Sequence, residues 1–332
     1  MNLTYPDYYH QFSCIAGNCP DSCCKEWDVT VDEISAARYR ALEGPLGDDL
    51  RRVLEDEDGE TLMRQTPDRR CPMWRQDGLC RIQAELGEEA LCRVCTDFPR
   101  LRHDYGDFVE LGLELSCPEA TRLILQNPSP AMIQSQVAGG EAPEYDPMDM
   151  AVLKDTRQQA HAILDAGLPM GDALAALLLY GYRAQAMLDG EEMTPFHPES
   201  AAEEAYSLAQ PGSMEDIYAL YRTLEILTPT WRDLLQGTPV QNSWTDAHRA
   251  MARHFIDRYW LQAISDLDLV GRVKFIITSC LMIRSMPMDV VGAAQLYSKE
   301  IENDADNVYA LLDAAYTCPA LTDVKLLYLL TH

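Results

Sequence analysis

Nine of the 11 cysteines in this 332-residue chain lie between Cys14 and Cys117. The crowding begins with the stretch CIAGNCPDSCC, and its members are Cys14, Cys19, Cys23, Cys24, Cys71, Cys80, Cys92, Cys95 and Cys117. Dense cysteines form disulfides in small secreted domains. Because a chain of this length can bury a sizeable core without such crosslinks, we expect these thiols to bind a metal or an iron–sulfur cluster.

The spacing of the cysteines leaves the kind of metal open. A structural zinc site takes four ligands, often from two CxxC pairs, whereas iron–sulfur clusters take four cysteines at more varied spacings. This region has one CxxC pair, in LCRVC, and its only histidines are His10 and His103. Both observations favour an iron–sulfur cluster, with zinc as the alternative. Nine thiols suffice for two four-ligand sites with one spare, or for one site and several buried thiols.

The adjacent pair Cys23 and Cys24 is expected to have divided duties, because neighbouring side chains diverge. One thiol would bind a metal, and the other would bind at a second site or pack in the core. The CxxxCxxC motif of radical enzymes that cleave S-adenosylmethionine fails here, since its third position is Glu26. Cys280 and Cys318 are isolated, and we expect them to pack as small hydrophobic residues.

The charge and hydropathy of the chain exclude several classes of partner. A formal net charge of −26 disfavours contact with nucleic-acid phosphates and suits a basic partner. The longest apolar run, Ala173–Tyr182, is shorter than the roughly 18 residues of a membrane span. The stretch MNLTYPDYYHQF lacks the basic and apolar segments of a secretory signal. We therefore expect a cytoplasmic protein with no nucleic-acid or membrane partner.

The predicted fold class is mainly α, with an irregular cysteine-rich, metal-binding N-terminal region, an all-helical domain and no Rossmann sheet. We expect residues 1–127 to form the cysteine-cluster region, residues 128–147 a linker or surface crossing, and residues 148–332 the helical domain. Apolar residues at helical spacing predict helices over 31–42, 118–126, 147–166, 171–188, 199–208, 214–227, 230–235, 244–267, 271–285, 290–303, 308–315 and 321–330. The charge run EDEDGE (Glu55–Glu60) predicts a solvated loop, and no hairpin is expected.

Several motifs occur in one order within residues 1–127. They are FSCIAGNCPDSCCKEWDVTVD, then RRCPMW, then DGLCRIQAELGEEALCRVCTDFPR, and finally LELSCPEA. In this order they resemble the flagellin lysine-N-methylases, a bacterial family. The helical remainder of the chain offers no motif that extends the resemblance.

The resemblance implies a protein lysine methyltransferase that acts on flagellin of the bacterial flagellum. It implies S-adenosylmethionine as the methyl donor and a cysteine-bound iron–sulfur centre, for which a 4Fe-4S cluster is the favoured form. No GxGxxG turn is present, so the donor would bind to a fold other than the usual doubly wound sheet. The alternative is a non-enzymatic cysteine-cluster module that binds or senses metal and carries a helical protein-interaction domain.

Five further residues are candidates for this chemistry. Arg100 could bind the carboxylate of the donor through its guanidinium fork, or form a salt bridge with an acidic neighbour. Trp27 could face the sulfonium by a cation–π contact, or pack in the core. His103, Asp104 and Tyr105 are possible acceptors for the proton that the substrate lysine must lose.

Overall fold

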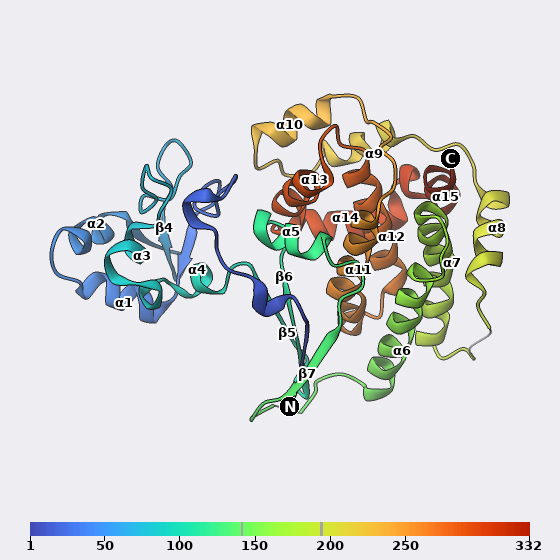
Figure 1. The fold of residues 1–332 in the computed structure, drawn as a ribbon, viewed down its shortest axis with the longest axis horizontal. Helices are drawn as coiled ribbons and strands as arrows, with labels where there is room; N and C mark the ends of the chain where they lie inside the picture. Colours follow the sequence, from blue (N-terminus) through green and yellow to red (C-terminus); the bar gives the residue numbers. More distant parts are fainter. Residues whose placement is uncertain (141, 193–194) are drawn as a thin grey trace.

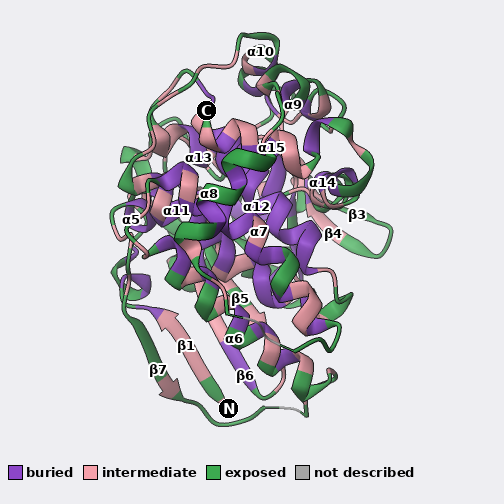
Figure 2. Ribbon diagram, turned by 90° about the vertical axis from the view of Figure 1, so that its right-hand side faces the viewer, coloured by how far each residue is buried: buried purple, intermediate pink, exposed green. Residues whose placement is uncertain are grey.

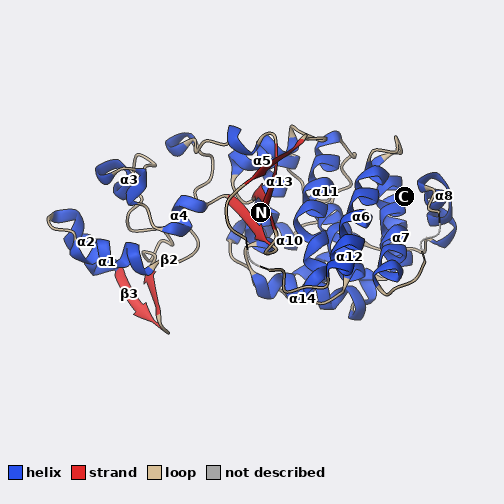
Figure 3. Ribbon diagram, turned by 90° about the horizontal axis from the view of Figure 1, so that it is seen from below, coloured by secondary structure: helices blue, strands red, loops and turns tan. Residues whose placement is uncertain are grey.

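The computed structural model describes residues 1–140, 142–192 and 195–332. It shows a small lobe built from residues between Ser13 and Asp97, set apart from a larger helical body (Figure 1). The protein is mainly helical, as predicted, but it also contains two small sheets. Seen from below, the strands lie in the small lobe and at the side of the body nearest to it (Figure 3).

The helical body contains most of the helices and one large hydrophobic core. Helix α12 is buried from Leu269 to Ile283, which explains why apolar residues occur on every side of it, with Arg272 and Lys274 as the charged exceptions (Figure 2). Helices α7 and α11 pack against α12. The helices are α5 Pro118–Leu125, α6 Pro147–Leu164, α7 Met170–Leu188, α8 Pro198–Leu208, α9 Met214–Tyr221, α10 Pro229–Gln236, α11 Asp246–Tyr259, α12 Leu269–Arg284, α13 Val290–Tyr297, α14 Ala305–Thr317 and α15 Asp323–Thr331.

Aspartate side chains cap the N-termini of several of these helices, so part of the large negative charge stabilises helix ends. Asp268 accepts a hydrogen bond from the Gly271 N–H at the start of α12. Asp289 does the same for α13, where it accepts from the N–H groups of Val291 and Gly292. These bonds satisfy donors that the first turn of a helix leaves free.

The small lobe has its own hydrophobic core, centred on the fully buried Tyr39 and Leu50. Its elements are α1 Glu33–Ala41, α2 Pro45–Val53, α3 Arg81–Leu86, α4 Arg93–Asp97, and the strands β2 Val29–Val31, β3 Leu54–Glu57 and β4 Glu60–Met63. Strands β3 and β4 form a hairpin that contains the EDEDGE run, so the expected loop there is wrong. Asp58 and Gly59 make its two-residue turn with φ angles of 50° and 88°, the conformation that favours Asp-Gly.

The second sheet joins the N-terminus to the helical body. Its order is β5-β6-β1-β7, with β1 Asn2–Pro6 parallel to β6 Phe108–Leu113. Strand β5 Arg100–Asp104 pairs antiparallel with β6, and β7 Met132–Gln136 pairs antiparallel with β1. Strand β7 lies within the expected linker, whose Glu141 lies outside the described residues. Strands β5 and β6 form a second hairpin that was not expected from the sequence.

The two hydrophobic cores draw on residues that do not follow the expected domain boundaries. The expected boundaries themselves stay predictions. Tyr8, Phe12, Leu113 and Ile124 belong to the core of the helical body, although they lie within residues 1–127. The small-lobe core draws its buried members from residues 29–92. The first strand and the segment after Asp97 therefore bring the two ends of the cysteine-rich region onto the helical body.

Candidate functional site

A cavity of about 1140 Å³ lies between the small lobe and the helical body. All nine cysteines between Cys14 and Cys117 line it, together with residues from α11 and from the segment that follows α13. The other two cysteines lie elsewhere: Cys280 is fully buried in α12, and Cys318 ends α14. The fold thus brings together thiols that are up to 103 residues apart in the chain.

The influences of the nine thiols on one another's pKa values define two groups, which meet at the adjacent pair Cys23 and Cys24. In the first, burial and then the neighbouring Cys19 and Cys14 raise the pKa of Cys117 to about 11. The pKa of Cys23 is raised chiefly by its contact with Cys24 and by burial, with smaller effects of Cys14 and Cys117. We call Cys14, Cys19, Cys23 and Cys117 the outer thiol group.

The second group surrounds Cys24. Burial, followed by the charges of Cys24, Cys80 and Cys92, raises the pKa of Cys71 to about 12. A hydrogen bond between the thiols of Cys92 and Cys95 lowers the pKa of Cys92, which favours its thiolate form. We call Cys24, Cys71, Cys80, Cys92 and Cys95 the inner thiol group. Cys23 and Cys24 contact each other, and Cys23 also acts on Cys95, so the division of duties within the adjacent pair stays a prediction.

The thiols are gathered without being arranged as a closed metal site. Across the described residues, no three Cys, His, Asp or Glu side chains are positioned to hold one metal ion. The kind of donor fits a soft metal or an iron–sulfur cluster, because both prefer thiolates. Metal binding would therefore draw the thiols of each group closer together, as happens where a metal orders a loop-rich segment.

The opposite wall of the cavity carries charged residues of the helical body. A π-helical turn, Ser298–Glu302, follows α13 and contributes Lys299, Glu300 and Glu302 to the lining. Such turns are frequent at functional sites. Glu300 accepts hydrogen bonds from Leu227 N–H and from Thr228, so its carboxylate holds the start of α10 Pro229–Gln236.

A buried ion pair lies at the base of this wall. Arg258 of α11 contacts Glu302 at 3.4 Å between Nη1 and Oε1, and the Tyr259 hydroxyl donates to the same oxygen at 2.8 Å. Glu302 Oε2 has no hydrogen-bond partner in the described structure. Glu114 lines the cavity nearby and accepts from the Ser116 hydroxyl. Burial raises the pKa of Glu114, and the positive charge of Arg258 opposes that rise.

Asp21 connects the two walls. Its Oδ2 accepts hydrogen bonds from Lys299 at 3.1 Å and from Gln295 at 2.9 Å, and its Oδ1 contacts Lys25 at 2.6 Å. Burial opposes ionisation of Asp21, but the contacts with Lys25 and Lys299 outweigh it and lower its pKa. The CPDSCC loop is therefore anchored to the π-helical turn by charge.

The cavity contains two of the five candidate residues named from the sequence. Trp27 lines it, and the cation that faces its ring is Lys299, with Nζ 5.5 Å from the ring centroid. Arg100 also lines it; its guanidinium lies 5.2 Å from the Phe12 ring centroid and donates to the Thr96 carbonyl at 3.5 Å. No ion pair involves Arg100 among the described residues. The roles of Trp27 and Arg100 in donor binding stay predictions.

The three candidate proton acceptors lie on the β5–β6 hairpin and are not among the lining residues of the cavity. Asp104 accepts from the Gly106 N–H and pairs with Arg102, and these contacts lower its pKa. Tyr105 stacks on Phe108, and burial raises its pKa. Burial lowers the pKa of His103. Their roles as proton acceptors stay predictions.

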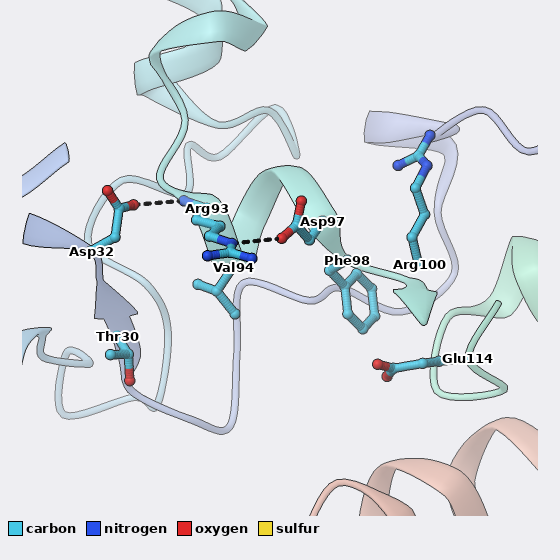
Figure 4. A pocket seen from close by; sticks show the side chains of 8 residues that line it. All are labelled: Thr30, Asp32, Arg93, Val94, Asp97, Phe98, Arg100 and Glu114. Atoms are coloured by element: carbon cyan, nitrogen blue, oxygen red, sulfur yellow. Dashed lines mark hydrogen bonds and ion pairs between the residues drawn. The ribbon is translucent and has the colours of Figure 1, made fainter. Parts of the chain in front are cut away.

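A smaller pocket of about 370 Å³ adjoins the cavity (Figure 4). Its lining residues are Thr30, Asp32, Arg93, Val94, Asp97, Phe98, Arg100 and Glu114. Figure 4 shows the Phe98 ring and the Glu114 carboxylate close together, while the Arg100 side chain extends away from Glu114. Glu114, Lys299, Glu302 and Arg258 were not predicted as site residues. Glu114 lies within the LELSCPEA motif, and Lys299 and Glu302 lie in one short turn, but only the fold shows that these residues and Arg258 share one cavity.

The fold and the cavity define a mainly helical protein with a cysteine-rich lobe, and comparisons with known proteins identify relatives. The chain is 34% identical over 139 residues to the flagellar biosynthetic protein FliU of Salmonella muenchen, a match that covers 39% of this chain and 79% of FliU. It is also 34% identical over 138 residues to lysine-N-methylases of Salmonella typhimurium strain LT2 and Salmonella choleraesuis strain SC-B67. Each of these matches covers 39% of this chain and 33% of the relative.

The chain therefore belongs to the flagellin lysine-N-methylase family, as its motifs predicted. It spans about a third of the length of the two lysine-N-methylases that it matches. No family model matches the chain, and no solved structure matches it. No helix in the described part of the chain is long and apolar enough to cross a membrane.

Proposed function

We propose that the protein is a lysine N-methyltransferase that transfers methyl groups from S-adenosylmethionine to the lysine side chains of flagellin in the cytoplasm. The cavity between the two lobes carries this proposal, because it combines nine thiols with a wall of charged side chains. Its volume of about 1140 Å³ exceeds that of most single-ligand pockets, so it has room for the donor and a lysine side chain together. The names of the two lysine-N-methylases support the same activity, and the name of FliU supports a role in the flagellum.

The reaction places simple demands on the cavity. The lysine ammonium loses a proton, its lone pair forms the new N–C bond, and the S–C bond of the sulfonium breaks to release a thioether. Holding the two reactants in line can supply much of the rate. The acidic side chains and the net charge of −26 attract a cationic lysine.

We further propose that the thiol groups hold an iron–sulfur cluster, with 4Fe-4S as the favoured form and zinc as the alternative. Each group has at least the four thiols that such a centre takes. A bound cluster would order the cysteine loops and supply a one-electron redox centre beside the cavity. The chain's own residues would orient the reactants: Arg100 and Trp27 line the cavity and would contact the donor, while Asp21 and Lys299 would hold the loop.

The proposal is tested by incubating the protein with S-adenosylmethionine labelled on its methyl group and with flagellin. Label should enter flagellin, and it should not enter flagellin whose lysines have been acetylated. If the protein contains its metal and no label enters flagellin, the methyltransferase proposal fails. A metal-binding module that acts on no substrate would then be the better account of the cysteine cluster.

A further inference from the structure

The smaller pocket joins the large cavity through shared lining residues. Thr30, Val94, Phe98, Arg100 and Glu114 line both. The pocket is therefore the outer part of one continuous space, and Glu114 lies where its two parts meet. We call this outer part the Glu114 groove.

Apolar side chains form one side of the groove. Val94 is 50% exposed, so its side chain offers apolar surface to the groove. Phe98 is half-buried and packs against Trp27, with 6.5 Å between the ring centroids. These side chains offer a surface for a flexible hydrocarbon chain.

The charges of the groove leave one carboxylate available. Asp97 is paired with Arg93 at 3.3 Å, and Asp32 accepts hydrogen bonds from two N–H groups, those of Ser35 and Arg93. In the described parts of the chain, Glu114 forms no ion pair with a basic side chain. Arg258, whose positive charge opposes the rise in the pKa of Glu114, is itself paired with Glu302.

A lysine side chain matches this arrangement. It has a four-carbon stem that covers apolar surface and a terminal ammonium that needs acceptors. The guanidinium of Arg258 is paired with Glu302, and the Arg100 side chain extends away from Glu114, so the Glu114 carboxylate is left for an ammonium to balance. We propose that the Glu114 groove admits the substrate lysine, with its stem on Val94 and Phe98 and its ammonium at Glu114. This inference rests on the proposed function and adds the path and the binding residue.

Two variants test the groove, each with a matched control. Glu114→Gln keeps the shape of the side chain but removes the charge, and Val94→Arg blocks the groove with a cation. The controls are Glu215→Gln, an exposed carboxylate of α9 paired with Arg222, and Ile34→Arg, which alters an 82% exposed apolar residue of α1 outside both pockets. Two quantities are measured: KM for a lysine-containing flagellin peptide in the methyl-transfer assay, and its Kd without donor.

We expect KM and Kd to rise by at least about tenfold for Glu114→Gln, because a charge-assisted hydrogen bond is lost. The same rise is expected for Val94→Arg, because the new cation blocks the groove. Both controls should stay close to wild type. The wild type should also bind the lysine peptide more tightly than the same peptide with acetylated lysines, and Glu114→Gln should abolish that preference. If the wild type methylates flagellin and the two groove variants match their controls, the groove inference is overturned while the function stands.

The binding measurement separates this inference from the proposed function. If the wild type transfers no methyl group, the proposed function fails. The groove inference is then tested only by whether the wild type binds the lysine peptide more tightly than the acetylated peptide. A preference for lysine over acetyl-lysine that disappears in Glu114→Gln would then still support a lysine-binding groove. Equal binding of the two peptides by the wild type would overturn it.

Discussion

Lys299 donates a hydrogen bond to Asp21 across 278 residues of sequence, with 3.1 Å between Nζ and Oδ2. The Lys299 side chain is only 3% exposed, and its Nζ also faces the ring of Trp27. Asp21 lies in the loop that carries Cys19 and Cys23, whereas Lys299 lies in the π-helical turn. This pair therefore holds the cysteine-rich loop against the charged wall of the helical body.

Replacing Lys299 with methionine should destabilise the protein by about 1–3 kcal/mol, because it removes a buried charge from a partner that stays in place. The matched control is Lys25→Met, which removes the other lysine that forms an ion pair with Asp21. The Lys25 side chain is 33% exposed, so its loss should cost less than about 1 kcal/mol. Urea unfolding of both variants measures the difference. Equal free energies of unfolding for the two variants would show that the Lys299 contact does not anchor the loop.

The two thiol groups predict the metal content of the protein. Anaerobically purified protein should contain about four irons and four sulfides per chain if one group holds a 4Fe-4S cluster, and about eight of each if both do. Cys24→Ser and Cys92→Ser should lower the iron content, whereas Cys280→Ser and Cys318→Ser should leave it unchanged. If the protein contains zinc instead of iron, the proposed metal is wrong. If Cys24→Ser and Cys92→Ser keep the full metal content, the assignment of these cysteines as ligands is wrong.

Stability should depend on pH through His248, which is buried at the start of α11. Its Nδ1 accepts the Thr245 N–H, and burial lowers its pKa from 6.5 to about 4. The unfolded chain therefore binds a proton more readily, so stability is full above pH 6.5 and is lost as the pH falls toward 4. The loss should reach about 2–3 kcal/mol. Unfolding curves between pH 7 and 4 measure it, and His248→Gln should reduce the slope; an unchanged slope would contradict this assignment.

The helices could be predicted from sequence because their apolar periodicity is sustained. Helices α6, α7 and α12 lie where that pattern placed them, with ends that differ by a few residues. The sheets were missed for different reasons. The β3–β4 hairpin has an exposed, acidic strand, so its apolar alternation is weak, and the Asp58–Gly59 turn was its one clear signal. The parallel pairing of β1 with β6 joins residues over 100 positions apart, which no local pattern encodes.

The candidate site was predictable only where residue type itself carries the chemistry. The nine cysteines were identified because clustered thiols are rare outside metal sites and disulfides. Glu114, Arg258 and Lys299 were not, because single charged residues are common and usually lie on the surface. Their importance comes from burial beside one cavity, which is a property of the fold.

Mass spectrometry of flagellin after incubation with the protein and S-adenosylmethionine tests the central claim most directly. The account predicts lysines whose mass increases by one or more methyl groups with the wild type and with Cys280→Ser, and unmodified lysines with Cys92→Ser. Unmodified flagellin after incubation with metal-containing wild-type protein would contradict it.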